Sequence, residues 1–67
     1  MSVAKVTEIT ASSTESFEDA VRQGIKRADK TLDKIRGAWI KEMKVDVEEG
    51  EVVAYRVDMK VTFLLKD

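Results

Sequence analysis

The feature that most constrains the fold is an apolar face that recurs without interruption near the end of the sequence. Its members stand at every second position, namely Val53, Tyr55, Val57, Met59, Val61, Phe63 and Leu65. Because alternate residues of a β-strand face the same side, this spacing predicts an amphipathic strand over residues 53–65 of an antiparallel sheet. Residues 48–51 form the predicted turn, since Gly50 can adopt a positive φ angle. The chain is therefore expected to end in a β-hairpin.

The other strand of this hairpin is predicted over residues 36–48, and its apolar residues change phase along it. Ala38 and Ile40 share one face, whereas Met43 and Val45 share the other. One extra residue in a strand turns the following side chains over. The phase change therefore predicts a β-bulge in this strand.

A strand and a long helix are predicted ahead of the hairpin. Residues 4–11 are rich in β-branched side chains, which favour a strand. The hydroxyl residues 12–14 are typical of a helix start, with Ser12 and Glu15 at the spacing of a capping box, and a helix is predicted over residues 14–34. One stripe of this helix carries Phe17, Ala20, Val21, Gly24, Ile25, Ala28 and Leu32. The predicted order is β-α-β-β, an α+β fold in which a three-stranded antiparallel sheet wraps on one helix.

The lengths of these elements predict self-association. A strand of about 15 residues spans roughly 50 Å, whereas a helix of about 20 residues spans roughly 30 Å. The helix therefore leaves part of the hairpin uncovered, and Phe63, Leu65 and Met43 are expected in an exposed apolar patch. A chain of 67 residues without cysteine also lacks the disulfides that support many small domains. We expect a single domain over residues 1–67 that works as a homo-oligomer.

The charge and the residue inventory argue against several classes of function. The 12 basic and 13 acidic residues leave a net charge of −1, without the basic excess typical of nucleic-acid-binding proteins. No apolar run suits a transmembrane helix or a signal peptide, so a cytoplasmic protein is expected. The sequence contains neither His nor Cys, which removes common general bases, thiol nucleophiles and zinc ligands. A binding protein is therefore favoured over an enzyme.

Trp39 and Arg56 are the candidate residues for binding a flat ligand. The indole of Trp39 either packs in a core or interface or serves as a stacking platform. Arg56 lies on the polar face of the last strand, where it either pairs with a carboxylate such as Asp58 or Glu42 or hydrogen-bonds a ligand. The carboxylates around the hairpin turn are Asp46, Glu48, Glu49 and Glu51. They are either solvated or, with copies from other subunits, ligands for a hard cation such as calcium.

Taken together, these segments resemble the dodecin family. The segments that carry the resemblance are Ser13-Thr14-Glu15-Ser16-Phe17, Tyr55-Arg56-Val57 and Val61-Thr62-Phe63. The resemblance covers essentially the whole chain and implies β-α-β-β subunits assembled into a hollow homododecameric shell of cubic 23 symmetry. It also implies a flavin buffer rather than an enzyme, with riboflavin, lumichrome or flavin mononucleotide (FMN) as the ligand.

Two positions of the family's flavin site differ in this chain. Where the family pattern has a tryptophan in the second strand and a glutamine after the tyrosine of the last strand, this sequence has Gly37 and Arg56. Trp39 lies two residues further on, a shift of roughly 7 Å along the same strand face. Either Trp39 and Arg56 serve a shifted pocket for riboflavin or FMN, or the chain resembles a subgroup without both contacts that is linked to calcium. Glu42 and Asp46 resemble acidic channel-lining positions and are the candidate metal ligands.

Overall fold

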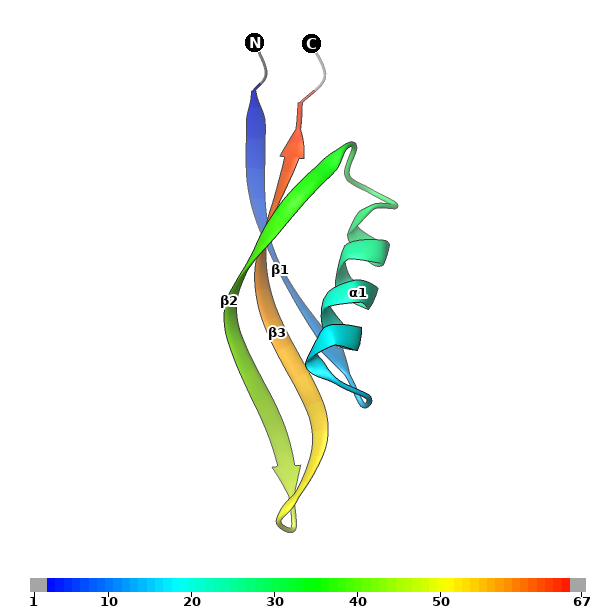
Figure 1. Ribbon diagram of the computed structural model, residues 1–67, viewed down its shortest axis with the longest axis vertical. Helices are drawn as coiled ribbons and strands as arrows, with labels where there is room; N and C mark the ends of the chain where they lie inside the picture. The colour runs from blue at the N-terminus through cyan, green and yellow to red at the C-terminus, as the bar shows by residue number, and fades with distance from the viewer. Residues whose placement is uncertain (1–2, 66–67) are drawn as a thin grey trace.

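The computed structural model describes residues 3–65 and shows a three-stranded antiparallel sheet with one helix lying against it (Figure 1). The elements in chain order are strand β1 (Ala4–Ser13), helix α1 (Phe17–Ala28), strand β2 (Ile35–Glu48) and strand β3 (Glu51–Leu64). This is the predicted β-α-β-β order and α+β class. Residues 1, 2, 66 and 67, at the ends of the expected single domain, lie outside the described residues.

Helix α1 begins later than predicted because Ser16, and not Ser12, is its N-cap. The Ser16 backbone is extended (φ −171°, ψ 166°), and its hydroxyl oxygen accepts a hydrogen bond of 2.9 Å from the Asp19 N–H. The Ser13 hydroxyl donates to the Asp19 carboxylate at 2.6 Å. Ser12 instead belongs to β1, where it pairs with Arg56 of β3. The predicted capping box at Ser12 was therefore wrong.

Helix α1 also ends six residues before the predicted position 34. The carbonyl oxygen of Ala28 accepts hydrogen bonds from the N–H groups of Thr31 (3.0 Å) and Leu32 (2.9 Å), and from the Thr31 hydroxyl (3.3 Å). These bonds close the chain into a turn, since a threonine hydroxyl competes for helical backbone groups. Lys34 then adopts a positive φ of 50° and leads into β2. No helix among residues 3–65 is long and apolar enough to cross a membrane.

Strand β3 is the centre of the sheet, whose strand order is β1-β3-β2. It pairs antiparallel with β1 on one side and with β2 on the other. The β2–β3 register shifts between Ile40 and Glu42, which confirms the predicted bulge. The hairpin turn is also as predicted: Gly50 has φ 79°, and Glu49 beside it has φ 50°. Strands β1 and β2 are therefore the two edges of the sheet.

The core is small and lies between α1 and the β1–β3 half of the sheet. Its buried members are Ala20 of the helix and Val57, Met59 and Val61 of β3. Phe17 adds an edge-on aromatic contact with Tyr55, with ring centroids 5.1 Å apart. These residues are the predicted helix stripe and the predicted apolar face of the last strand. The sequence pattern thus identified which surfaces pack together.

Gly24 marks the closest approach of the helix to the sheet. A Cβ atom at this position would lie 2.6 Å from Met59 Cε and 2.9 Å from the Ala11 Cβ. We expect Gly24→Ala to lower the free energy of unfolding, because overpacking costs about 1–3 kcal/mol and at contacts this short outweighs the roughly 1 kcal/mol gained in helix propensity. Thermal unfolding tests this, with Gly37→Ala as the control, since no atom lies within 4 Å of a Cβ there. A Gly24→Ala protein that melts higher than wild type would contradict it.

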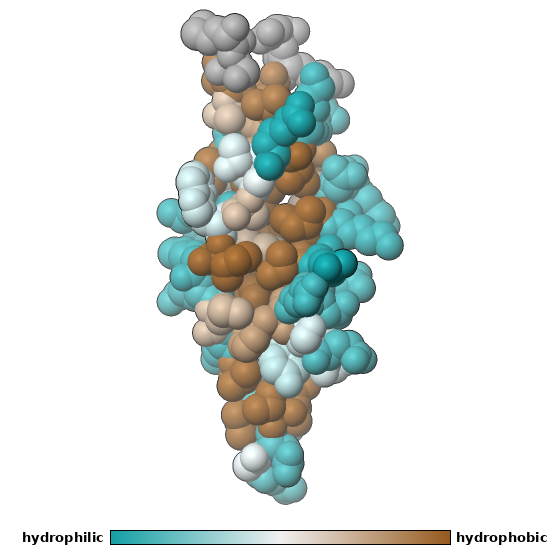
Figure 2. All heavy atoms as spheres, in the orientation of Figure 1, coloured by the Kyte–Doolittle hydropathy of each residue, from teal (hydrophilic) through white to brown (hydrophobic). Residues whose placement is uncertain are grey.

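Strand β2 carries apolar side chains that α1 does not cover. We call this set the β2 strip, and it consists of Ile40, Met43, Val45, Val47 and the adjoining Val53, all exposed. Figure 2 shows hydrophobic side chains gathered along the visible face down to the hairpin end. The expected patch is confirmed at Met43 (55% exposed) and Leu65 (45% exposed). Phe63 is partly buried and contributes less than expected.

Candidate functional site

The face of the sheet opposite α1 carries the predicted site residues. The core residues of β3 have odd numbers, so its even-numbered side chains point away from the helix. Residues paired across neighbouring strands lie on the same face of the sheet. We call the face opposite α1 the open face and assign its residues from the strand register. Among its members are Val6, Glu8, Thr10 and Ser12 of β1, Gly37, Trp39, Glu42, Lys44 and Asp46 of β2, and Ala54, Arg56, Asp58, Lys60 and Thr62 of β3.

The bulge in β2 is what brings the aromatic and acidic candidates onto one face. Trp39 is paired with Lys60, and Glu42, three residues later, is paired with Asp58. Three residues is an odd separation, which in a regular strand places two side chains on opposite faces. Lys41 is the extra residue of the bulge, and it shifts the alternation by one position. Glu42 therefore lies on the open face together with Trp39.

Trp39 is exposed and lies beside an empty space at Gly37. Its side chain is 64% exposed, so no packing within the chain seals it. Gly37 is on the same face, and no atom lies within 4 Å of where its Cβ would be. Both residues line a shallow cavity of about 340 Å³, together with Arg36, Ala38 and Thr62. The structure thus brings two of the three flavin-site candidates together, in a form that can accept a planar ring.

Arg56, the third candidate, is held elsewhere by an ion pair. Its guanidinium nitrogen Nη2 donates to Asp46 Oδ2 at 2.7 Å, and this hydrogen bond holds the pKa of Asp46 below its usual value. Arg56 is therefore paired with a cross-strand carboxylate, as one of the two alternatives predicted, but the partner is Asp46 and not Asp58 or Glu42. Arg56 is paired with Lys44 in the register, four residues along β3 from the position facing Trp39. At 3.3 Å per residue this is roughly 13 Å, so Arg56 does not line the Trp39 cavity of its own chain.

The candidate metal ligands Glu42 and Asp46 occupy different surroundings. Glu42 lines a second cavity of about 370 Å³ on the open face, together with Thr10, Asp58 and Arg56. Asp46 is already engaged by Arg56. Among residues 3–65 no three acidic side chains come close enough together to hold a metal ion. A cation held by Glu42 or Asp46 would therefore take its remaining ligands from groups other than a third acidic side chain of the same described residues.

A pair of carboxyl groups that sequence reasoning missed lies between β1 and β3. A hydrogen bond with Glu8 raises the pKa of Asp58, and the same bond, followed by the charge of Lys41, lowers the pKa of Glu8. Lys41 Nζ is 3.5 Å from Glu8 Oε2. One Asp58 oxygen, Oδ1, is buried without a hydrogen-bond partner among the described residues. Only the strand register reveals this pair, because 50 residues separate its members in the sequence.

The carboxyl pair predicts a defined pH dependence. The raised pKa of Asp58 stabilises the fold below its usual value of 3.8, and this contribution is lost as the pH rises through the folded-state pKa. The lowered pKa of Glu8 contributes stability above 4.5, which is lost as the pH falls through its own folded-state pKa. The pair therefore stabilises most in mild acid, where it holds one proton. At neutral pH two carboxylates face each other.

We therefore expect Asp58→Asn to raise the melting temperature slightly at pH 7 and to flatten its decline from about pH 4 to pH 7. The asparagine amide donates a hydrogen bond to Glu8 at every pH. Glu15→Gln also replaces a carboxylate by an amide, but on an exposed side chain, and is the control. Equal pH profiles for wild type and Asp58→Asn would refute the shared proton.

Comparison with known proteins gives the class of protein that this fold and site define. The family model described as dodecin matches residues 3–66. The chain belongs to the dodecin family, and its α+β fold is the dodecin fold. The family predicted from residues 13–17 and from the two segments of the last strand is thereby confirmed.

Individual dodecins resemble the chain over almost its full length. A protein of Mycobacterium tuberculosis named calcium dodecin is 33% identical over 66 residues, which cover 98% of this chain and 93% of that protein. The dodecin of Streptomyces davaonensis superposes with a TM-score of 0.94 at 32% identity, covering 98% of this chain and 97% of that one. The solved calcium dodecin of M. tuberculosis, described as having a novel calcium-binding site, has a TM-score of 0.82 at 32% identity, covering 96% and 91%.

Proposed function

We propose that the chain forms a cytoplasmic homo-oligomer, a homododecamer by family resemblance, that binds and stores riboflavin or FMN without catalytic turnover. The observation that carries this proposal is the exposed indole of Trp39 beside the empty space at Gly37. A large aromatic side chain left open on a polar sheet face is a platform for stacking a planar ring. A cavity of about 340 Å³ is also within the usual size range of small-molecule sites.

The surroundings of Trp39 suit a flavin that carries a negative charge. Lys60 is the residue paired with Trp39 on β3, and Arg36 lines the same cavity. Both side chains supply hydrogen-bond donors and positive charge for a phosphate. Thr62 adds a hydroxyl that can donate or accept. These contacts favour FMN over riboflavin as the tighter ligand.

Self-association is supported by the exposed β2 strip and by the two unpaired edges of the sheet. An apolar strip of this length is a liability on a monomer, because exposed contiguous patches mark interaction sites. Unpaired edge strands likewise invite pairing with other chains. A second subunit also brings further side chains to the shallow Trp39 cavity, which one chain leaves largely open. Binding and assembly are therefore coupled in this proposal.

Titration of riboflavin and FMN against the native protein, followed by flavin fluorescence, tests the proposed ligand. Saturable quenching at micromolar protein is the expected result, because indole stacking quenches the flavin. Absence of quenching for both ligands would refute flavin storage. Analytical ultracentrifugation of the same sample tests assembly independently, and a stable species near 7.6 kDa would refute it.

Calcium is the second candidate ligand, favoured by the calcium dodecin relative and by the cavity that holds Glu42 and Asp58. Two carboxylates and the Thr10 hydroxyl supply the oxygen ligands that calcium prefers. Calorimetric titration with calcium chloride, compared between wild type and Glu42→Gln, tests this. A heat of binding that Glu42→Gln leaves unchanged would exclude Glu42 as a ligand.

A further inference from the structure

The end of the β2–β3 hairpin combines apolar and acidic side chains in one exposed region, which we call the acidic tip. Its apolar members are Val45, Val47, Val52 and Val53, and its acidic members are Glu48, Glu49 and Glu51. The three carboxylates form no salt bridge within the described part of the chain. The tip projects past the helix in Figure 1. It therefore presents an apolar surface bordered by uncompensated negative charge.

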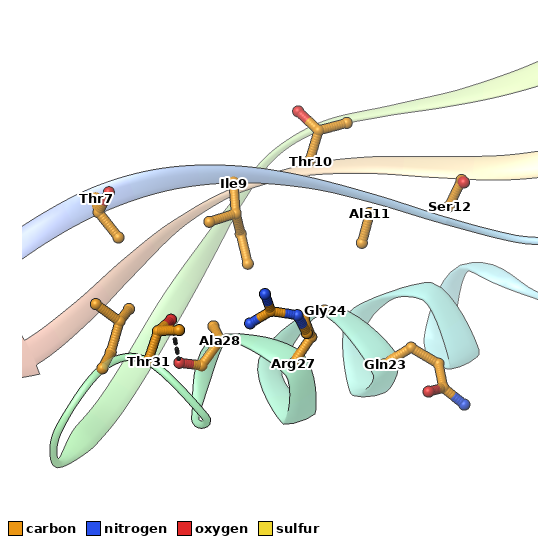
Figure 3. A pocket seen from close by; sticks show the side chains of 11 residues that line it. Thr7, Ile9, Thr10, Ala11, Ser12, Gln23, Gly24, Arg27, Ala28 and Thr31 are labelled. Carbon is orange, nitrogen blue, oxygen red and sulfur yellow. Dashed lines mark hydrogen bonds between the residues drawn. The ribbon is translucent and has the colours of Figure 1, made fainter.

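A groove bordered by positively charged side chains runs between α1 and the edge strand β1. This β1–α1 groove has a volume of about 560 Å³, and its apolar floor consists of Ile9, Ala11, Gly24, Ala28 and Leu32. Figure 3 shows the Arg27 side chain extending from the helix toward the space between helix and strand. Arg27, Lys26 and Lys30 also line an adjoining cavity of about 330 Å³ on the helix. We call these three residues the basic rim.

We propose that the acidic tip of one copy of this chain docks in the β1–α1 groove of a second copy, as a head-to-tail contact. The apolar residues of the tip match the apolar floor of the groove. Glu48, Glu49 and Glu51 equal the residues of the basic rim in number and are opposite to them in charge. Both surfaces also lie beside exposed edges of the sheet. This inference rests on the proposed homo-oligomer and names the surfaces that form it.

The head-to-tail contact has a consequence for symmetry. Two different surfaces meet in it, so it is heterologous, and its repetition forms a ring when the rotation closes and an open filament when it does not. A two-fold contact of the β2 strip with itself would instead be isologous and would bring the same patch of both copies together. Complementary charge across a contact favours the correct partner, whereas juxtaposed like charges cost several kcal/mol. The charge pattern therefore favours the contact of the acidic tip with the basic rim.

Charge reversal tests the pairing. The tip variant Glu48→Lys/Glu51→Lys and the rim variant Lys26→Glu/Lys30→Glu are each expected to weaken self-association by about tenfold or more at low salt. A chain that carries all four changes is expected to recover the wild-type assembly, because the charges again match. Sedimentation velocity measures the assembly, and circular dichroism checks the fold of each variant. Lys5→Glu/Lys44→Glu makes the same charge change as the rim variant on exposed residues outside the groove, the basic rim and the Trp39 cavity, and is the control.

The outcomes separate this inference from the proposed function. A monomeric wild-type protein overturns both. An oligomeric wild type whose tip and rim variants assemble normally overturns only the head-to-tail contact. Disruption by either variant without recovery in the combined chain also overturns it, because recovery is specific to this pairing. If a reversed variant does not fold, Glu48→Gln/Glu51→Gln and Lys26→Gln/Lys30→Gln are used, and each is expected to weaken assembly in the same direction.

Discussion

Trp39→Ala is expected to weaken the binding of riboflavin and FMN by roughly tenfold to a hundredfold. Stacking of a heteroaromatic ring on an aromatic side chain is worth about 1–3 kcal/mol when measured by alanine substitution, and each 1.4 kcal/mol is a factor of ten in affinity. Trp39 is 64% exposed in the chain, so its removal leaves the core intact. The loss should therefore appear in the flavin fluorescence titration without a change in the circular dichroism spectrum.

Two further variants determine whether stacking is the cause of this loss. Trp39→Phe keeps an aromatic face of smaller area and is expected to retain an intermediate affinity. Lys44→Ala, on the same open face but outside the Trp39 cavity, is the matched control and is expected to bind as wild type does. If Trp39→Ala bound flavin with unchanged affinity, the ligand platform would have to lie elsewhere.

Met43→Asp is expected to convert the oligomer into small species at micromolar protein concentration. Met43 is 55% exposed at the middle of the β2 strip, so an aspartate there is tolerated by a single chain. In an interface that covers the strip, the same aspartate is a buried charge without a partner. Such a charge costs about 3–5 kcal/mol, which is more than a hundredfold in the association constant.

Size-exclusion chromatography and sedimentation velocity measure this change. Lys44→Asp, at the neighbouring position of β2 but on the open face, is the control and is expected to assemble. A Met43→Asp protein with the sedimentation coefficient of wild type would show that the β2 strip stays exposed in the assembly. Flavin titration of the Met43→Asp protein also tests the coupling of binding to assembly, because binding should weaken with dissociation.

The parts of the fold that depend on periodicity could be predicted from the sequence. The alternation that ends at Leu65 identified the central strand and its buried face, and the phase change after Ile40 identified the bulge. The helix limits could not be predicted in the same way. They depend on which side-chain hydroxyl forms a hydrogen bond with the helix backbone. At the start this is Ser16, and at the end it is Thr31.

The candidate site could be predicted as a set of residues but not as an arrangement. Trp39 and Arg56 were identified from their side-chain chemistry, yet the ion pair of Arg56 with Asp46 and the hydrogen bond of Glu8 with Asp58 were not. Both interactions are cross-strand contacts. Their existence depends on the strand order β1-β3-β2 and on the register of each pair, and neither is contained in the residues of one strand.

The central position of β3 constrains how this protein can vary between lineages. Alternate residues of one strand supply the core through Val57, Met59 and Val61 and the open face through Arg56, Asp58 and Lys60. An insertion or deletion of one residue within β3 exchanges the two sets, placing charges in the core and apolar side chains at the ligand face. Substitution is then the tolerated route of change in this strand. Differences in length should accumulate in the turns after Ala28 and around Gly50.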